Sequence, residues 1–214
     1  RWHGLGHIVA LHFNRGRLLT RACVLTSTHH LSFPQVHATD SGYLATVETC
    51  DPQQSIYSFD ALGEPWKPLG FNLPSGLVDP AMGRDLTGTW LVTGSDRSRA
   101  TENRVRQFAT SSGNPGDWQE AGSWSHGNLA RGGGALDPVR RLRVIQDCSE
   151  NYGAAMGLAV WPPGHDVEEP TVARWIRKED LAAFQGAWQG SHTMNWTPDG
   201  TTVVIDLWRR RPQV

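Results

Sequence analysis

The sequence lacks an excess of either charge and lacks any long apolar run. Its 214 residues hold 20 Lys and Arg against 21 Asp and Glu, a formal net charge of −1. This balance gives no electrostatic basis for binding nucleic acid, so no such partner is expected. The longest apolar run, "AAMGLAVW" at 154–161, is only as long as a strand. A membrane span is therefore not predicted.

Cysteine is also scarce, and its spacing excludes two further classes of protein. The three cysteines, Cys23, Cys50 and Cys148, are odd in number and far apart. They predict neither a disulfide scaffold nor a zinc site, and they favour a cytoplasmic protein, with secretion left open. His3 and His7 are four residues apart, but that spacing joins two ligands only on a helix, and this stretch is typical of strand or coil. We expect no metal and no cofactor.

Helical periodicity is nearly absent. The best candidate is 178–188, "KEDLAAFQGAW", where Leu181, Phe184 and Trp188 would share one helical face. Elsewhere, short alternating runs are separated by Gly, Pro, Asp and Asn. This pattern is typical of many antiparallel strands and predicts an all-β protein.

Four segments share the form strand, turn, strand: 32–49, 77–94, 130–147 and 191–208. Each of the first three is followed by a third strand: "QSIYSF" at 54–59, "RVRQFA" at 104–109 and "AAMGLAV" at 154–160. The outer turns that follow the first two of these strands resemble each other and place Trp66 and Trp118 at corresponding positions. Four-stranded antiparallel units that recur every 45–60 residues or so are typical of the blades of a β-propeller.

We therefore expect residues 1–214 to form a single β-propeller domain. The fourth hairpin, at 190–208, has no outer strands, whereas two N-terminal strands within 5–25, "HIVALHF" and "RLLTRACVL", have no inner ones. These N-terminal strands either complete the last blade and close the ring, or form the outer half of a truncated first blade. The prediction is thus a five-bladed propeller, or a four-bladed or truncated one.

A propeller brings distant residues together, because the first strand of every blade lines the central channel. Aligning the repeats puts four polar residues near blade starts: Ser32, Asp79, Arg131 and His192. Glu48 and Asp147 end second strands, on the same side. We expect these side chains to share a polar pocket on the axis.

Several of these segments resemble motifs of one known family. They are "HHLSFPQV", "VETC", "LVDPAM", "ARGGGAL", "VIQDCSENYG" and "GSHTMNW". The sequence resembles the N-terminal domain of glucosamine inositolphosphorylceramide transferase-like proteins, which is similar to the five-bladed propellers of furanosidases such as arabinanases. The resemblance runs from about residue 5 to 211, and "HLSFPQV" with "QDCSENYG" is its most specific part. Family members begin with an Asp-Pro-Phe-type inner strand, which this sequence does not show ahead of "GHIVAL" at 6–11.

The resemblance implies a carbohydrate-active domain with a fused or adjacent transferase module. It implies that a sugar-sized pocket is faced by His30, Ser32, Glu48, Asp79, Arg131, Gln146, Asp147, Tyr152 and His192. The ligand would be a glycan or a glycosylated small molecule.

The acidic residues leave the chemistry open. Glu48 and Asp79, with Asp147, could cleave a glycoside, since two close carboxylates push their pKa values apart and one keeps a proton to donate. Alternatively, Asp79 hydrogen-bonds a turn and Glu48 pairs with an arginine. Gln146 and Asp147 would bind vicinal hydroxyls, or Asp147 would pair with Arg131 or Arg143.

Three functions follow from these readings. The first is glycoside-hydrolase-like chemistry, with Glu48, Asp79 and Asp147 as catalytic residues. The second is non-catalytic recognition of a glycan or glycolipid in support of a neighbouring transferase, in which the same residues form hydrogen bonds and tryptophans stack on the sugar. The substrate-binding residues would be His30, Ser32, Arg131, Gln146, Tyr152 and His192. The third is a structural propeller that binds protein on its rim.

Overall fold

A computed structural model describes most of the chain. The described residues are 5–51, 54–73, 77–96, 104–110, 117–125, 131–149, 153–160, 171–184, 188, 190–191, 193–197 and 199–206. The described part is all-β, with one 3-10 helix, η2 (Asp180–Ala183), and no α-helix. No helix of this part has the length and apolarity that crossing a membrane requires.

Two four-stranded antiparallel sheets follow one another along the chain, as the repeats predict. The first has the order β3 (Leu31–Thr39), β4 (Gly42–Thr49), β5 (Gln54–Phe59), β6 (Lys67–Leu73). The second has the order β7 (Leu77–Arg84), β8 (Trp90–Asp96), β9 (Arg104–Thr110), β10 (Trp118–Ser125).

The third repeat forms part of a larger sheet. Its strands are β11 (Gly132–Asp137), β12 (Leu142–Asp147), β13 (Ala155–Val160) and β14 (Thr171–Ile176), again in chain order. The fourth hairpin, β15 (Met194–Trp196) and β16 (Val203–Ile205), joins this sheet because β15 pairs in parallel with β11, Gly134 opposite Met194. The hairpins predicted from the sequence are therefore confirmed.

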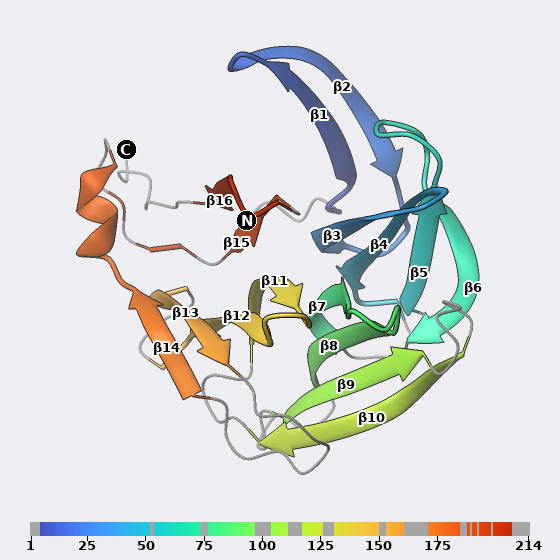
Figure 1. Ribbon diagram of the computed structural model, residues 1–214. Coiled ribbons are helices and arrows are strands. Elements are labelled where there is room, and N and C mark those ends of the chain that lie inside the picture. Colours follow the sequence, from blue (N-terminus) through green and yellow to red (C-terminus); the bar gives the residue numbers. More distant parts are fainter. Residues whose placement is uncertain are drawn as a thin grey trace.

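The sheets are arranged like blades. Figure 1 shows them around a common centre, with β3, β7, β11 and β15 nearest to it and β6, β10 and β14 at the rim. The N-terminal strands β1 (Ile8–Asn14) and β2 (Arg17–Leu25) form a two-stranded sheet of their own. Within the described residues, β15 pairs with β11 and β16 pairs with β15, and neither strand pairs with this hairpin. Closure of the ring stays a prediction.

The segment predicted to be helical behaves differently from the α-helix expected at 178–188. Its described residues contain the 3-10 turn of η2 and no α-helix; Leu181 in this turn is buried, whereas Phe184, which follows it, is 48% exposed. The two side chains thus do not share one buried face, and short helices without such a face are marginal in water. Residues 185–187 lie outside the described part.

Two clusters of buried apolar side chains hold the blades together. One joins the first two blades and contains Leu44, Ile56, Leu73, Leu77, Met82, Trp90, Val92 and Phe108. The other fixes the N-terminal hairpin to the first blade, with Ile8 and Val24 packed among Leu31, Ala45, Val47, Phe59 and Trp66. The Trp66 N–H also donates to the Val24 carbonyl, at 2.9 Å.

Candidate functional site

The inner strands share an irregularity that shapes the centre of the molecule. Each of the first three has a break in its register with the next strand, between Ser32 and Gln35, Val78 and Ala81, and Gly132 and Leu136. Inside the first two breaks, Phe33 and Asp79 both have φ of +50°, and each is followed by proline. Such bulges re-aim side chains, and Asp tolerates this left-handed conformation better than most residues do.

Asp79 is aimed at Arg131, the residue just before β11. The Arg131 Nε donates to Asp79 Oδ2 at 2.8 Å, and Nη2 donates to Oδ1 at 3.3 Å. Asp79 is only 2% exposed, whereas Arg131 is half-buried. A two-pronged pair of this kind is strong and directional. It therefore fixes the Asp79 carboxylate in one orientation.

Gly132 allows the two strands to come this close. A Cβ atom at Gly132 would lie 2.7 Å from the carbonyl oxygen of Asp79 and 3.0 Å from its Cβ. Gln146, which is fully buried, holds the same segment from the other side. Its backbone N–H donates to the Arg131 carbonyl at 3.0 Å, and its side-chain Nε2 donates to the carbonyl of Gly132. Gln146 thus positions Arg131.

Glu48 completes the cluster from β4. The backbone N–H of Asp79 donates to Glu48 Oε2 at 3.3 Å, and Ser32 is the residue opposite Glu48 in the β3–β4 pair. Burial raises the pKa of Glu48 to about 7, and the charge of Asp79 and a side-chain hydrogen bond with it act in the same direction. The backbone hydrogen bond and the charge of Arg131 oppose this shift. Near neutral pH, Glu48 therefore keeps its proton to a far greater extent than an ordinary glutamate does.

A second arginine lies behind the carboxylates. Arg143, in β12, is 3% exposed, and burial lowers its pKa to about 10 while the charge of Asp79 works against that change. From the sequence, Arg143 is considered only as a partner of Asp147. The sequence could not have shown that Arg143 interacts with Asp79, because the two residues belong to different blades.

The structure thus brings together Ser32, Glu48, Asp79, Arg131 and Gln146 of the predicted site. Asp147 follows Gln146 at the end of β12 and is half-buried, and its Oδ1 accepts the backbone N–H of Ser149 at 2.9 Å.

His30 is not among the groups that contact this cluster in the described structure. It is exposed, and its Nδ1 accepts the Gly6 N–H at 3.0 Å. Tyr152 and His192 lie outside the described residues.

One further acidic residue was not predicted from the sequence. The Asp206 carboxylate, just after β16, accepts the Thr193 N–H at 2.6 Å and lies 3.5 Å from the Ser191 hydroxyl. The repeat pattern could have predicted this residue. Asp206 follows the second strand of its hairpin, much as Glu48 and Asp147 lie at the ends of theirs.

A cavity of about 740 Å³ lies near the other end of β3, beside β1 and β2. Glu48, Asp79 and Arg131 are not among its lining residues. Within the described part of the chain, no group of three or more His, Cys, Asp or Glu side chains is arranged to hold a metal ion.

Comparisons with known proteins give no match for this chain among protein-family models, curated proteins or solved structures. Function must therefore be argued from the site itself.

Proposed function

We propose that this domain acts on a glycoside or a glycosylated small molecule, with Glu48 as the proton donor. The observation that carries the proposal is a buried carboxyl group in contact with a second carboxyl group that is tied to an arginine. Asp79 is bound by Arg131 through both of its oxygens, and burial together with the charge of Asp79 raises the pKa of Glu48 to about 7. Pairs of acids whose environments separate their proton affinities are typical of acid-catalysed glycoside cleavage.

In this proposal each residue has a distinct task. Glu48 gives its proton to the oxygen of the leaving group as the bond to the anomeric carbon breaks. Water attacks that carbon, and the proton it loses passes to Asp147, the more accessible acid at the end of β12. Asp79 is buried and bound by Arg131 through both oxygens, so its task is to support Glu48: burial, and then the charge of Asp79, raise the pKa of Glu48. Ser32 and Arg131 would bind sugar hydroxyls.

The same site supports a second candidate, recognition of a glycan without cleavage. The observation that favours it is the firm pairing of Asp79, which leaves only one carboxyl group of the contacting pair available to react. Under this alternative the domain presents a glycan or glycolipid to a neighbouring transferase module. The finer fold prediction, a propeller of four or five blades related to furanosidases, belongs to this proposal too and is supported by the recurring four-stranded sheets.

Turnover of paired substrates separates the two candidates. Methyl and 4-nitrophenyl glycosides, both furanosides and pyranosides, are incubated with the wild-type protein and with Glu48→Gln. Loss of the acid should lower kcat/KM by at least about 100-fold for methyl glycosides. The loss should be much smaller for nitrophenyl glycosides, because the nitrophenolate leaving group needs little protonation. Glu64→Gln, in an exposed loop, is the matched control.

Equal losses on the two substrate types would contradict the role of Glu48 as the acid. If no glycoside turns over, yet a glycan binds and Asp147→Ala weakens that binding, recognition without cleavage is the correct function. If no glycan binds and none turns over, both candidates are wrong.

A further inference from the structure

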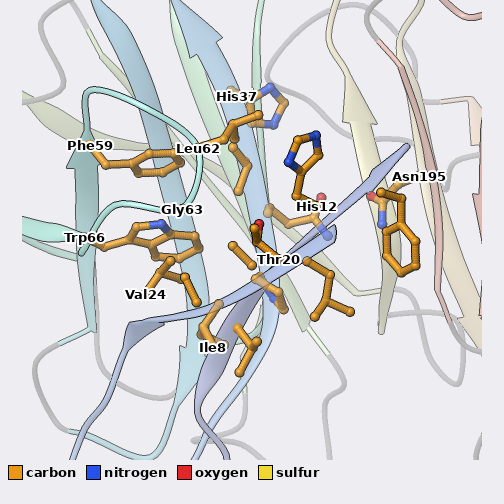
Figure 2. Close-up of a pocket in the computed structure, with 18 of the residues that line it drawn as sticks. Ile8, His12, Thr20, Val24, His37, Phe59, Leu62, Gly63, Trp66 and Asn195 are labelled. Carbon is orange, nitrogen blue, oxygen red and sulfur yellow. The ribbon is translucent and has the colours of Figure 1, made fainter. Parts of the chain in front are cut away.

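The cavity beside the N-terminal hairpin has no role in the chemistry proposed for Glu48. It has a volume of about 740 Å³ and lies between β1–β2 and residues 34–37 of β3, with Ala135 and Leu136 of β11 and Asn195 and Trp196 of β15 (Figure 2). Phe59 and Trp66 of the first blade close one side of it. Five separate parts of the chain thus contribute to one space.

The walls of this cavity are mostly apolar and its floor is rigid. Ile8, Val24, Phe59 and Leu136 are buried side chains that also line it. The rings of Phe59 and Trp66 stack at 5.2 Å with an angle of only 5° between their planes. A volume of several hundred Å³ with apolar walls is typical of a site for a small organic molecule.

The lining has an unusual electrostatic property. None of the described residues around the cavity is Asp, Glu, Lys or Arg. Its polar members are His12, Thr20, Gln35, His37 and Asn195. A charged ligand would lose its hydration here without gaining an opposite charge, which is costly. A neutral ligand loses far less.

His37 is held in its neutral form. Burial lowers its pKa to about 4, and only a hydrogen bond with the backbone of Met82 works against this shift. Its ring also packs edge-on against Trp90, with centroids 6.1 Å apart. Since a neutral imidazole has one acceptor nitrogen, His37 can accept a hydrogen bond at any pH well above 5. In Figure 2 the rings of His12 and His37 lie next to each other in the view.

We propose that this cavity binds an uncharged, largely apolar small molecule that carries a hydroxyl or N–H group. The aromatic and aliphatic walls would hold its body, and His37, Gln35 and Asn195 would receive its polar end. The site is separate from Glu48 and Asp79, and it does not depend on the function proposed for them.

The floor of the cavity argues for a small molecule and against a flat protein partner. Gln35, Val24 and Ile8 are each nearly inaccessible, so a ligand must enter a hollow to reach them. A flat partner surface would reach only the exposed lining residues, such as Leu11 and Phe13.

Three matched probes test the ligand class: 1-pyrenemethanol, its methyl ether and 1-pyrenecarboxylate. Binding is followed by pyrene fluorescence anisotropy at pH 7.5. We expect saturable binding of one pyrenemethanol per chain. The ether should bind about threefold more weakly, as loss of one hydrogen bond predicts. The carboxylate should bind at least about tenfold more weakly, because its charge would be buried without a partner.

A pair of variants locates the site. Leu11 of β1 lines the cavity and is 52% exposed, and Leu19 of β2 is 49% exposed and does not line it. Leu11→Glu should weaken pyrenemethanol binding at least about tenfold, because it brings a charge into the lining. Leu19→Glu, on the same hairpin, should leave binding within about twofold. Circular dichroism and urea unfolding of both variants check that the fold is kept.

Several results would overturn the proposal. One is no saturable binding of pyrenemethanol by wild-type protein. Another is equal binding of pyrenemethanol and the carboxylate, or equal effects of Leu11→Glu and Leu19→Glu. A wild-type dimer in light scattering that Leu11→Glu alone converts to a monomer would show that a second copy of the chain occupies the cavity instead.

Discussion

Asp79 combines three features at the scale of a single residue. Its backbone has a φ of +50°, its side chain is almost completely buried, and both of its carboxylate oxygens bind Arg131. Left-handed backbone and a buried charge each cost free energy, and such residues cluster at functional sites. For the neighbouring Glu48, burial is the largest cause of a pKa raised to about 7, and the charge of Asp79 adds to it.

The raised pKa of Glu48 predicts a pH-dependent stability. In the folded protein this pKa, about 7, lies above the ordinary value of 4.5, so the folded state holds an extra proton between these values. The resulting stability is fully present below about pH 4.5 and is lost as the pH rises through 7. Glu48→Gln should match wild type at pH 4 and be more stable by about 2 kcal/mol at pH 8.

Urea unfolding at pH 4, 6 and 8 measures this difference, with the exposed Glu64→Gln as the control. A difference between Glu48→Gln and wild type that does not change with pH would show that Glu48 is an ordinary acid in the folded protein.

At the scale of elements, the inner strands depend on glycine where they meet. Gly134 has φ of +129°, and a Cβ atom there would clash with the backbone of Met194, its partner in the only parallel pairing described, between β11 and β15. Gly132 likewise lies against the backbone of Asp79, so two of the three glycines at 132–134 permit close contacts between strands of different repeats.

Gly134→Ala tests this contact. The added methyl group should force β15 away from β11 and lower the free energy of unfolding by about 2–3 kcal/mol. Amide exchange at 194–196 should rise more than in β12. Gly16→Ala is the matched control, since Gly16 also has a positive φ of +78°, but a Cβ atom there would have no other atom within 4 Å. Equal effects of the two changes would show that backbone strain alone matters.

At the scale of the whole molecule, the N-terminal hairpin depends on the first blade. Tyr43, Phe59 and Trp66 form a column of stacked rings, with centroids 5.0 Å and 5.2 Å apart, and Ile8 and Val24 pack against it. In the described structure, the hairpin is therefore held mainly by packing against aromatic rings, and less by backbone hydrogen bonds. Phe59 and Trp66 of this column also line the cavity.

Trp66→Ala should loosen this attachment. We expect a loss of about 3 kcal/mol in the free energy of unfolding, since a large buried ring is removed. Amide exchange in β1 and β2 should rise at least about tenfold, while exchange in β8 and β9 should change only with global stability. Leu86→Ala, at an 86% exposed position, should change neither quantity. Unchanged exchange in β1 and β2 would show that the hairpin is held by other contacts.

The sequence by itself determined the strands. Alternating side chains and turn residues are local properties, so β3–β5, β7–β9 and the later hairpins could be read from the chain. It also determined that Ser32, Asp79 and Arg131 stand near the starts of inner strands, because that follows from repetition. The α-helix expected at 178–188 was not found in the described part of that segment. A helical pattern in the sequence does not by itself provide the buried face that a short helix requires.

Only the tertiary structure decided how those residues interact. The pairing of Asp79 with Arg131, the proton affinity of Glu48 and the approach of Arg143 all depend on distances between blades, which no local pattern encodes. The uncharged cavity is likewise made by β1, β3, β11 and β15 together. Burial and charge act through space. The sequence could therefore predict which residues belong to the site, but it could not predict their ion pairs or pKa values.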